Sequence, residues 1–485
     1  MDSGYTVAQI REAEARAFAV VGPDALMQRA AAGLAAAILR RFRQARPEGR
    51  RKGSYGARVL LVVGPGNNGG DSLFAGAGLA RRGVRATAWR VTAKAHESAW
   101  AAFLQAGGRE VDAATALRDL GSQHAVVDGV AGIGSRPGLD APVARLADAC
   151  REQEVPVVAV DLPSGLAPEP PFVDAPHFRA DLTITFGGYK LCHLMEPGRS
   201  ACGRVELVDL GLDLTEATVS RWTPAELAAV WPVPDATSDK YSRGVVGLDT
   251  GSVNYPGAAV LSTAGAVIAG AGMIRYLGPA TVASRVLDRF PNVVTTPGRV
   301  QAHVLGCGWG ERADGESVVA TAIVSELPTV VDADALRYLP KMGSHRTLLT
   351  PHAGELARLL GRERTEVEAD PLAAVRAAVA TTGCTVLLKG ATQYVASPGK
   401  DRVWLAVPGS AWTAQAGSGD VLAGICGTLL AAGLPPVTAA LAGASSQALA
   451  ARAAPGPIPP QELRLPLSLM IGHPGDAGAP RGRRP

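Results

Sequence analysis

The stretch Val59–Gly83 reads VLLVVGPGNNGGDSLFAGAGLARRG. An apolar run typical of a buried strand enters a loop of glycine, proline, asparagine and aspartate, and an alanine- and leucine-rich helical pattern follows. Glycine lets a backbone approach a ligand closely, and the start of a helix presents free N–H groups to an anion. The spacing is neither G-x-G-x-x-G nor that of a P-loop. The stretch therefore predicts a strand, a ligand-binding loop and a helix, with the side chains of Asn67, Asn68 and Asp71 at the strand end.

The length and composition indicate how many domains the chain forms and what their interiors contain. A chain of 485 residues is too long for one ordinary domain, so two or three are expected. Aromatic residues make up only 5%, so the interior must be built from alanine, valine, leucine and glycine. The net charge is +4, and the one dense basic run, Arg40–Gly53, lies between a helix and a strand. We interpret that run as a solvated connector, and no nucleic-acid partner is expected.

The cysteines indicate the cellular compartment of the protein, and the uncharged runs must be considered as possible membrane spans. The six cysteines form no CxxC pair, which indicates neither zinc nor a disulfide framework. The N-terminus has no signal pattern, so a reducing cytoplasm is the expected location. Thr250–Ile274 and Val421–Ala451 carry no charge and are long enough to cross a bilayer. Both are rich in small residues, and prolines 435 and 436 interrupt the second, so we interpret them as buried helices and expect no membrane partner.

Strand-like runs alternate with helical patterns along the whole chain, which predicts an α/β fold with mainly parallel sheets. The expected strands are Val59–Val63, Ala125–Val127, Pro156–Val160, Leu182–Phe186 and Val205–Val208, then Val245–Leu248, Val304–Leu305, Val330–Val331, Thr347–Leu349 and Thr385–Leu388. Between the two sets, Asp213–Gly244 is polar, contains three prolines and holds no strand candidate. We place a boundary near residue 220, giving domains at 1–220 and 221–472, with a disordered tail at 473–485.

Two further strand ends in the first half are polar. Asp128 ends one strand and is followed by a glycine-rich loop at 132–138, whereas Asp161 ends another and is followed by Leu-Pro-Ser-Gly. The carboxyl ends of parallel strands share one edge of the sheet, where ligands bind. Three such ends together favour a site over three separate helix caps.

The motifs GPGNNGGD, VDGVAGIG and DLPSG together resemble the NAD(P)H-hydrate epimerase family over about residues 6–215. The resemblance implies a Rossmann-like three-layer α/β/α domain and a potassium ion held by Asn68, Asp128 and Ser164. It also implies that a hydrated nicotinamide nucleotide is bound by Asn67, Asn68, Gly69, Gly70, Asp71, Gly132, Ile133, Gly134, Ser135, Arg136, Pro137, Gly138 and Asp161. Asp161 is the acidic group best placed to relay protons during epimerisation, the alternative being a cap for the following turn.

The second half carries separate chemistry. The sequence AGSGDVLAG puts Asp420 beside the start of an uncharged helix, whose N–H groups can stabilise a transferring phosphoryl group. Asp420 can accept a proton from an attacking hydroxyl, and Lys389 ends a strand where a nucleotide could be contacted. His352 stands at another strand end, and Gly306–Gly310 forms a further glycine-rich loop.

These motifs, with VVDADAL, TPHAGE and LLKGAT, resemble the ADP/ATP-dependent NAD(P)H-hydrate dehydratase family over about residues 236–455, which implies a ribokinase-like fold. By matching motifs, the hydrated nucleotide would contact Ala258, Gly310, His352 and Asp420. The adenine nucleotide would contact Lys389, Gly390, Ala391, Thr392, Gln393 and Gly419. ADP or ATP is the implied co-substrate, together with magnesium.

The two resemblances imply one repair enzyme that acts on NADHX and NADPHX, the hydrated forms of NADH and NADPH. Phosphorylation turns the added hydroxyl into a leaving group, and elimination restores the ring. A ribokinase-like kinase for a vitamin precursor, fused to a non-catalytic binding domain, remains an alternative, as does a non-enzymatic scaffold related to mRNA-decapping assembly proteins. A homo-oligomer is expected. The preference between NADHX and NADPHX, the choice of ADP over ATP and the route of epimerisation stay open.

Overall fold

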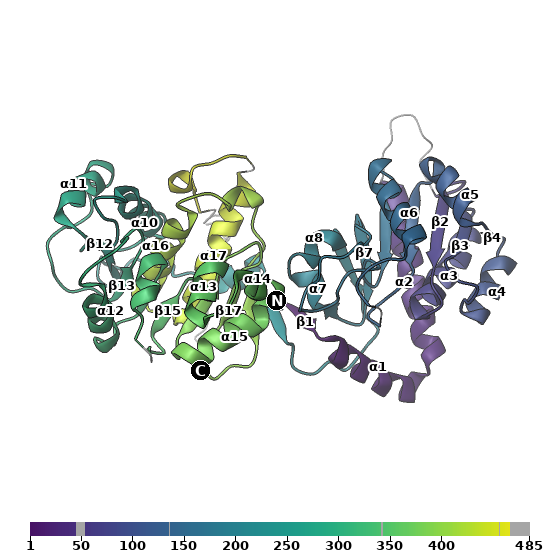
Figure 1. The fold of residues 1–485 in the computed structure, drawn as a ribbon, viewed down its shortest axis with the longest axis horizontal. Coiled ribbons are helices and arrows are strands. Elements are labelled where there is room, and N and C mark those ends of the chain that lie inside the picture. Colours follow the sequence, from purple (N-terminus) through teal and green to yellow (C-terminus); the bar gives the residue numbers. More distant parts are fainter. Residues whose placement is uncertain (45–53, 135, 341–342, 455, 466–485) are drawn as a thin grey trace. The chain divides into compact units, whose positions relative to one another are not determined.

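The computed structural model describes residues 1–44, 54–134, 136–340, 343–454 and 456–465. These residues divide into two compact units (Figure 1). One unit is Ser3–Thr218, and the other comprises the described residues from Val219 onward together with Met1–Asp2. Ser135 and the tail expected at 473–485 lie outside the described residues.

The N-terminal unit is built on a parallel sheet. Its strands, in spatial order, are β4 (Arg109–Glu110), β3 (Arg85–Arg90), β2 (Arg58–Val63), β5 (Ala125–Gly129), β6 (Val157–Val160), β7 (Leu182–Phe186) and β9 (Arg204–Val208). A short parallel pair, β1 (Asp2–Tyr5) and β8 (Tyr189–Lys190), lies outside this sheet. The predicted strands of the first half are all present, and the parallel sheet is confirmed.

Helices cover both faces of this sheet. The helices are α1 (Val7–Val21), α2 (Pro23–Gln44), α3 (Asn67–Ala80), α4 (Glu97–Gln105), α5 (Ala113–Arg118), α6 (Ala141–Glu152), α7 (Leu191–Leu194) and α8 (Gly198–Cys202). Val59, Leu61 and Val63 of β2 pack with α2, α3 and α4, whereas Leu60 and Val62 pack with α5 and α6. Because alternate side chains of a strand point to opposite faces, this continuous apolar run produces the three-layer α/β/α arrangement.

The C-terminal unit contains a mixed sheet. Parallel strands run in the order β12 (Met273–Tyr276), β11 (Val245–Asp249), β13 (Ala302–Leu305), β14 (Thr329–Val331), β15 (Thr347–Leu349) and β16 (Thr385–Leu388). Two antiparallel strands, β17 (Tyr394–Ala396) and β18 (Val403–Leu405), follow, and β10 (Val219–Arg221) pairs in parallel with β18.

The helices of this unit include two that touch through glycine. They are α9 (Pro224–Val230), α10 (Pro256–Ile268), α11 (Ala280–Arg289), α12 (Gly315–Val324), α13 (Ala353–Leu360), α14 (Arg364–Ala369), α15 (Pro371–Thr382), α16 (Ser418–Ala431) and α17 (Pro436–Ala453). A Cβ atom on Gly265 of α10 would lie 2.0 Å from the carbonyl oxygen of Val421, and one on Gly424 of α16 would lie 2.0 Å from that of Ser262. The small residues of the uncharged runs therefore serve helix–helix packing. No helix in the described part of the chain is long and apolar enough to cross a membrane.

Two local predictions were wrong. Asp213–Gly244 was expected to hold no strand, but it contains β10 and also α9. The pairing of Val219 with Val403 and of Arg221 with Leu405 stabilises this three-residue strand, which is too short to show a periodic pattern. Asn67–Asp71 was expected to be a loop but forms the first turns of α3, with Gly66 as its N-cap. Burial of this helix start outweighs the weak helix propensity of the Asn-Asn-Gly-Gly sequence.

Candidate functional site

The N-terminal unit gathers polar side chains at the carboxyl ends of β2, β5 and β6. Asp128 belongs to β5 and is fully buried, and its carboxylate accepts hydrogen bonds from Ser164 N at 2.7 Å and Ser164 Oγ at 2.6 Å. Burial raises the pKa of Asp128 to about 6, while the hydrogen bonds from Ser164 and from the amide of Val130 oppose this rise. These hydrogen bonds come from neutral groups, so a bound cation could still balance the negative charge of the carboxylate.

Asn68 contacts the loop that follows β5 and the end of β6. Its Nδ2 donates to the carbonyl oxygen of Val160 at 2.8 Å, which fixes the orientation of the amide. A Cβ atom on Gly132 would lie 2.5 Å from Asn68 Oδ1, so a larger residue there would displace the amide of Asn68. The Ser164 hydroxyl contacts both the amide nitrogen and the carbonyl oxygen of Ala131, at 2.9 and 3.1 Å. The structure thus brings Asn68, Asp128 and Ser164 together, with oxygen atoms of the kind that hard cations prefer.

Asp161 follows β6 and has an unusual backbone conformation. Its φ of 67° is in the left-handed region, and its side chain is buried. The carboxylate forms an ion pair with the buried ammonium of Lys190 and accepts a hydrogen bond from Thr185 Oγ1 at 3.0 Å. His193 Nε2 is 2.9 Å from the carbonyl oxygen of Asp161. Asp161 is therefore held from both its backbone and its side chain.

The remaining predicted residues of this unit surround the same strand ends. Burial, then the neighbouring Asp161 and Glu14, raise the pKa of Asp71 well above its ordinary value. A Cβ on Gly70 would meet His96 at 3.2 Å, and one on Gly134 would meet Arg11 at 3.1 Å. Asn67 and Gly69 are in the first turn of α3. Ile133 packs against the apolar cluster that contains Leu162 and Cys192, and the amide of Gly138 donates to the carbonyl oxygen of Gly165. Arg136 and Pro137 are exposed. Ser135 is outside the described residues.

Two groups of potential metal ligands occur in the described residues, although the sequence has no CxxC pair. The six cysteines are all free and buried. Ligand atoms of Cys192, His193 and Cys202 lie within 4.8 Å of one another. However, His193 Nδ1 accepts from the amide of Lys190 at 3.0 Å and Nε2 contacts the carbonyl of Asp161, so neither ring nitrogen is available to a metal. The second group, Cys307, Asp332 and Asp420, belongs to the other unit.

In the C-terminal unit, acidic and basic groups converge where β13, β14 and β16 end. Asp332 is buried, and its carboxylate accepts from Lys389 Nζ at 2.6 Å, from Thr350 Oγ1 at 2.8 Å and from Cys307 Sγ at 3.5 Å. The ammonium of Lys389 also lies 3.9 Å from Glu355. One cation therefore serves two carboxylates at this edge of the sheet.

Asp420 lies in the first turn of α16, next to this group. Burial, then the charge of Asp332, raise its pKa to about 7, whereas the charge of Lys389 lowers it. Gly417 caps the helix with a φ of 88°, and a Cβ on Gly419 would approach Lys389 Nζ to 3.3 Å. A carboxyl group with a pKa near neutrality beside a helix N-terminus suits a general base acting on an anionic substrate.

His352 and the predicted nucleotide loop flank Lys389. His352 is the N-cap of α13; its Nδ1 accepts from the amides of Gly354 and Glu355, at 3.0 and 3.2 Å. It also forms an isolated parallel bridge with Lys389, although its side chain is 54% exposed. Residues 389–393 form the hairpin loop between β16 and β17. The buried Oε1 of Gln393 has no hydrogen-bond partner in the described chain.

The other predicted residues of this unit lie by a cleft of about 940 Å³. Gly310 lines it, and its amide donates to Asp334 at 2.8 Å. Tyr255, Trp309 and Arg312 line the same cleft. Ala258 is not among the lining residues but touches the glycine-rich loop, because a Cβ on Gly308 would lie 2.4 Å from its methyl group. The loop 306–310 thus joins the cleft to Cys307, which contacts Asp332.

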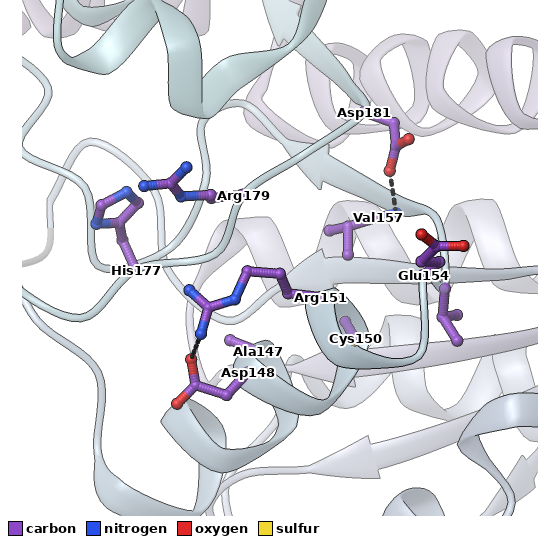
Figure 2. A pocket seen from close by; sticks show the side chains of 10 residues that line it. Ala147, Asp148, Cys150, Arg151, Glu154, Val157, His177, Arg179 and Asp181 are labelled. Carbon is purple, nitrogen blue, oxygen red and sulfur yellow. Dashed lines mark hydrogen bonds and ion pairs between the residues drawn. The ribbon is translucent and has the colours of Figure 1, made fainter.

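A smaller cavity of about 360 Å³ occurs in the N-terminal unit (Figure 2). It lies at the amino ends of β6 and β7, the opposite edge from Asp161, and its lining includes Arg151, His177 and Arg179. Figure 2 shows Arg151 turned onto Asp148, with which it pairs at 3.0 Å. No residue predicted for the site lines this cavity.

Sequence reasoning missed the partners of the predicted acids. Lys190, Thr185, Glu14 and Arg11 were not selected, because nothing in the sequence links them to Asp161 or to the loop at 132–134. Asp332 could have been selected, since it directly follows a predicted strand in the quoted VVDADAL.

Comparisons with known proteins match both units. A family model described as "YjeF-related protein N-terminus" matches residues 23–192, and one described as "NAD(P)H-hydrate dehydratase" matches residues 246–457. The bifunctional NAD(P)H-hydrate repair enzyme Nnr of Mycobacterium leprae is 43% identical, over 97% of this chain and 98% of its own length. The protein of the same name from Escherichia coli is 32% identical, over 81% of each chain. Among solved structures, the ADP/ATP-dependent NAD(P)H-hydrate dehydratase of Bacillus subtilis is 24% identical, covers 52% of this chain and 96% of its own, and has a TM-score of 0.46.

Proposed function

The chain belongs to the family of bifunctional NAD(P)H-hydrate repair enzymes, and we propose from this premise which unit performs each reaction. The N-terminal unit interconverts the R and S epimers of NADHX and NADPHX. The C-terminal unit dehydrates the S epimer to NADH or NADPH with ADP, releasing AMP and phosphate. The observation that carries the proposal is the convergence of Asp420, Lys389 and Asp332, three residues far apart in sequence, at one sheet edge beside a helix N-terminus.

The dehydratase site supplies the groups that phosphoryl transfer needs. The substrate hydroxyl attacks the terminal phosphorus of ADP, its proton passes to Asp420, and AMP departs. The backbone N–H groups at the start of α16 stabilise the charge on the transferring group. Phosphate then leaves from the ring carbon, and loss of the adjacent ring proton restores the double bond. His352, Gly310 and Ala258 are the proposed contacts of the hydrated nucleotide, and residues 389–393 with Gly419 those of the adenine nucleotide.

Magnesium is the proposed companion of the nucleotide. It would neutralise phosphate charge, and the carboxylates of Asp332 and Asp420, which lie within 4.8 Å of each other, are of the ligand type that magnesium prefers.

The N-terminal unit fits a potassium ion. Asp128 would supply the charge, and Asn68 and Ser164 neutral oxygens; among the described residues, the buried carboxylate accepts hydrogen bonds from the neutral groups of Ser164 and Val130. The ion would order the loop that carries Gly132 and would add positive potential near the substrate. Asp161 is the proposed proton relay. A homo-oligomeric state and a cytoplasmic location stay predictions.

The test incubates purified full-length protein with mixed NADHX epimers and follows NADH absorbance with and without ADP. We expect both epimers to be converted when ADP is present and neither when it is absent. Conversion of only the S epimer would contradict the epimerase assignment. A stable phosphorylated product without NADH would favour the kinase alternative.

A further inference from the structure

We infer that Lys190 is a positioning residue of the epimerase site, whose buried ammonium holds the Asp161 carboxylate in one orientation, so that Asp161 accepts a proton during epimerisation. The inference rests on the proposed epimerase function of the N-terminal unit. It adds a residue, and a direction of proton transfer, that the resemblance of the motifs did not assign.

The ammonium of Lys190 is fully engaged. Lys190 is 2% exposed, and its Nζ donates to the carboxylate of Asp161, to Thr185 Oγ1 at 3.1 Å and to the carbonyl oxygen of Phe186 at 3.0 Å. A lysine ammonium has three N–H donors, and each has an acceptor here. The only full negative charge among these acceptors belongs to Asp161. The pair is therefore matched in charge and shielded from water, where the attraction between the two groups is strongest.

The backbone of Lys190 also helps to hold Asp161. The amide of Lys190 donates to His193 Nδ1, so the ring proton is on Nε2, which donates to the carbonyl oxygen of Asp161 at 2.9 Å. The Asp161 amide donates to Ile184 O at 2.8 Å. These bonds maintain the φ of 67°, a conformation that aspartate rarely adopts unless its surroundings impose it. Such imposed backbone conformations concentrate at functional sites.

The charged groups around Asp161 divide into two kinds. Lys190 from β8 is its cation, whereas Asp71 from α3 and Glu14 from α1 are acids, and Arg11 faces Glu14. His193 and Cys192 from α7 also interact with Asp161. Burial raises the pKa of Asp71 well above its usual value, which favours its protonated form. Two carboxyl groups in one site thus differ in environment, and such a pair supplies a base and an acid.

The proton balance is that of an isomerisation. Asp161 takes a proton from the substrate as the configuration of the hydroxyl-bearing carbon is lost. It returns the proton as the carbon is re-formed, and the carboxylate is regenerated. This balance is that of ring opening: the hydroxyl gives its proton to Asp161, the bond from its carbon to the ring nitrogen breaks as the carbonyl forms, and the electron pair of that bond goes to the nitrogen. The reverse steps re-form the carbon with either configuration.

The experiment uses full-length protein and measures both reactions. Wild-type epimerisation is measured first, and its absence would refute the proposed function rather than this inference. Lys190→Met is then expected to lower kcat for epimerisation by about 10²-fold or more, with KM less affected. Lys190→Arg keeps a cation beside Asp161 and should restore most of the kcat that Lys190→Met loses.

Two controls separate positioning from a structural role. Thr185→Val removes a neutral hydrogen bond to Asp161 and one acceptor of Lys190, and should lower kcat less than Lys190→Met does. ADP-dependent repair of pure S epimer should be normal in every variant, since the other unit performs it. A Lys190→Met enzyme with the wild-type kcat would overturn the inference. Equal losses of kcat in Lys190→Met and Lys190→Arg would also overturn it.

Loss of the cation can destabilise the unit itself, because it leaves a buried carboxylate unpaired. The double variant Lys190→Met/Asp161→Asn has no unpaired charge. We therefore expect its N-terminal unit to unfold at a higher temperature than that of Lys190→Met alone. If the double variant is as unstable as the single one, Lys190 acts independently of Asp161 and the inference is overturned.

Discussion

Lys389 donates to the carboxylate of Asp332 across 2.6 Å, although β15 lies between β14 and β16, the strands after which these residues come. The side chain of Lys389 therefore crosses the end of β15, and its ammonium neutralises the buried charge of Asp332. Burial raises the pKa of Asp420 most, and both residues then modify it, because the charge of Asp332 raises this pKa further and the charge of Lys389 lowers it. An ion pair to which the proposed base does not belong thus adjusts its proton affinity.

Asp420→Asn should abolish dehydration and leave epimerisation intact. The amide has nearly the same shape but cannot accept the substrate proton, and removal of a general base costs about 10²–10⁴-fold in rate. NADH formation from the S epimer measures the first reaction, and exchange between separated epimers measures the second. Near-normal NADH formation by this variant would refute the assignment.

The rate of dehydration should rise with pH through about 7. The pKa of Asp420 is raised to about 7, and only its ionised form accepts a proton, so activity falls as pH drops below that value. In Lys389→Met the charge that lowers this pKa is absent, so the same limb should appear at higher pH. Initial rates between pH 5.5 and roughly pH 9 would show it. A flat profile in wild type would contradict the role of Asp420.

Potassium should stabilise the N-terminal unit mainly above pH 6. The folded-state pKa of Asp128 is about 6, above its ordinary value of 3.8, so stability is lost as pH rises through 6 and the carboxylate ionises in the interior. A bound cation offsets that loss, which amounts to roughly 3 kcal/mol from the size of the pKa shift. Thermal unfolding in potassium chloride and in choline chloride should differ at pH 8 and much less at pH 5. In Asp128→Asn, which keeps the shape without the charge, the two salts should give the same Tm.

Asn68→Ala should weaken epimerisation and its response to potassium. The amide oxygen is one of the proposed ligands, and its orientation is fixed by the bond to Val160. Anomalous scattering from crystals grown with thallium would locate the ion directly. A thallium-soaked crystal without a peak between Asn68, Asp128 and Ser164 would count decisively against the site.

Asp161→Ala should slow conversion of the R to the S epimer well below the wild-type rate, by about 10²-fold or more. Repair of pure S epimer with ADP should remain normal and shows that the chain is intact. If the variant folds and still interconverts epimers at the wild-type rate, Asp161 is only a cap for the turn at Leu162–Gly165.

The sequence predicted the central strands well, because strands buried on both faces are continuous apolar runs that end in polar residues. It did not predict β3, in which Arg85 and Arg90 enclose a short alternating segment, nor β10, which is stabilised by pairing with a strand far along the chain. Short or edge strands depend on tertiary partners that no local pattern encodes.

The candidate site was predictable to the same extent. Asp128, Asp161 and Asp420 could be selected because each stands at the end of a strand or the start of a helix. Lys190 could not, since it belongs to the two-residue strand β8 and meets Asp161 only in the folded chain. A buried lysine next to an acid becomes visible only when the sheet brings the two together.

The contact between α10 and α16 also limits how far Asp420 can move. Asp420 stands one helical turn before Gly424, the residue that lets the two backbones touch. A methyl group at Gly424 or Gly265 would push α10 and α16 apart. Because a helix moves as a rigid body, the first turn of α16, which carries Asp420, would move as well. Since catalysis tolerates far smaller errors of position than folding does, such a substitution would impair turnover before it unfolded the unit. The two glycines therefore fix the distance between the helices, and with it the position of the proposed base relative to its substrate.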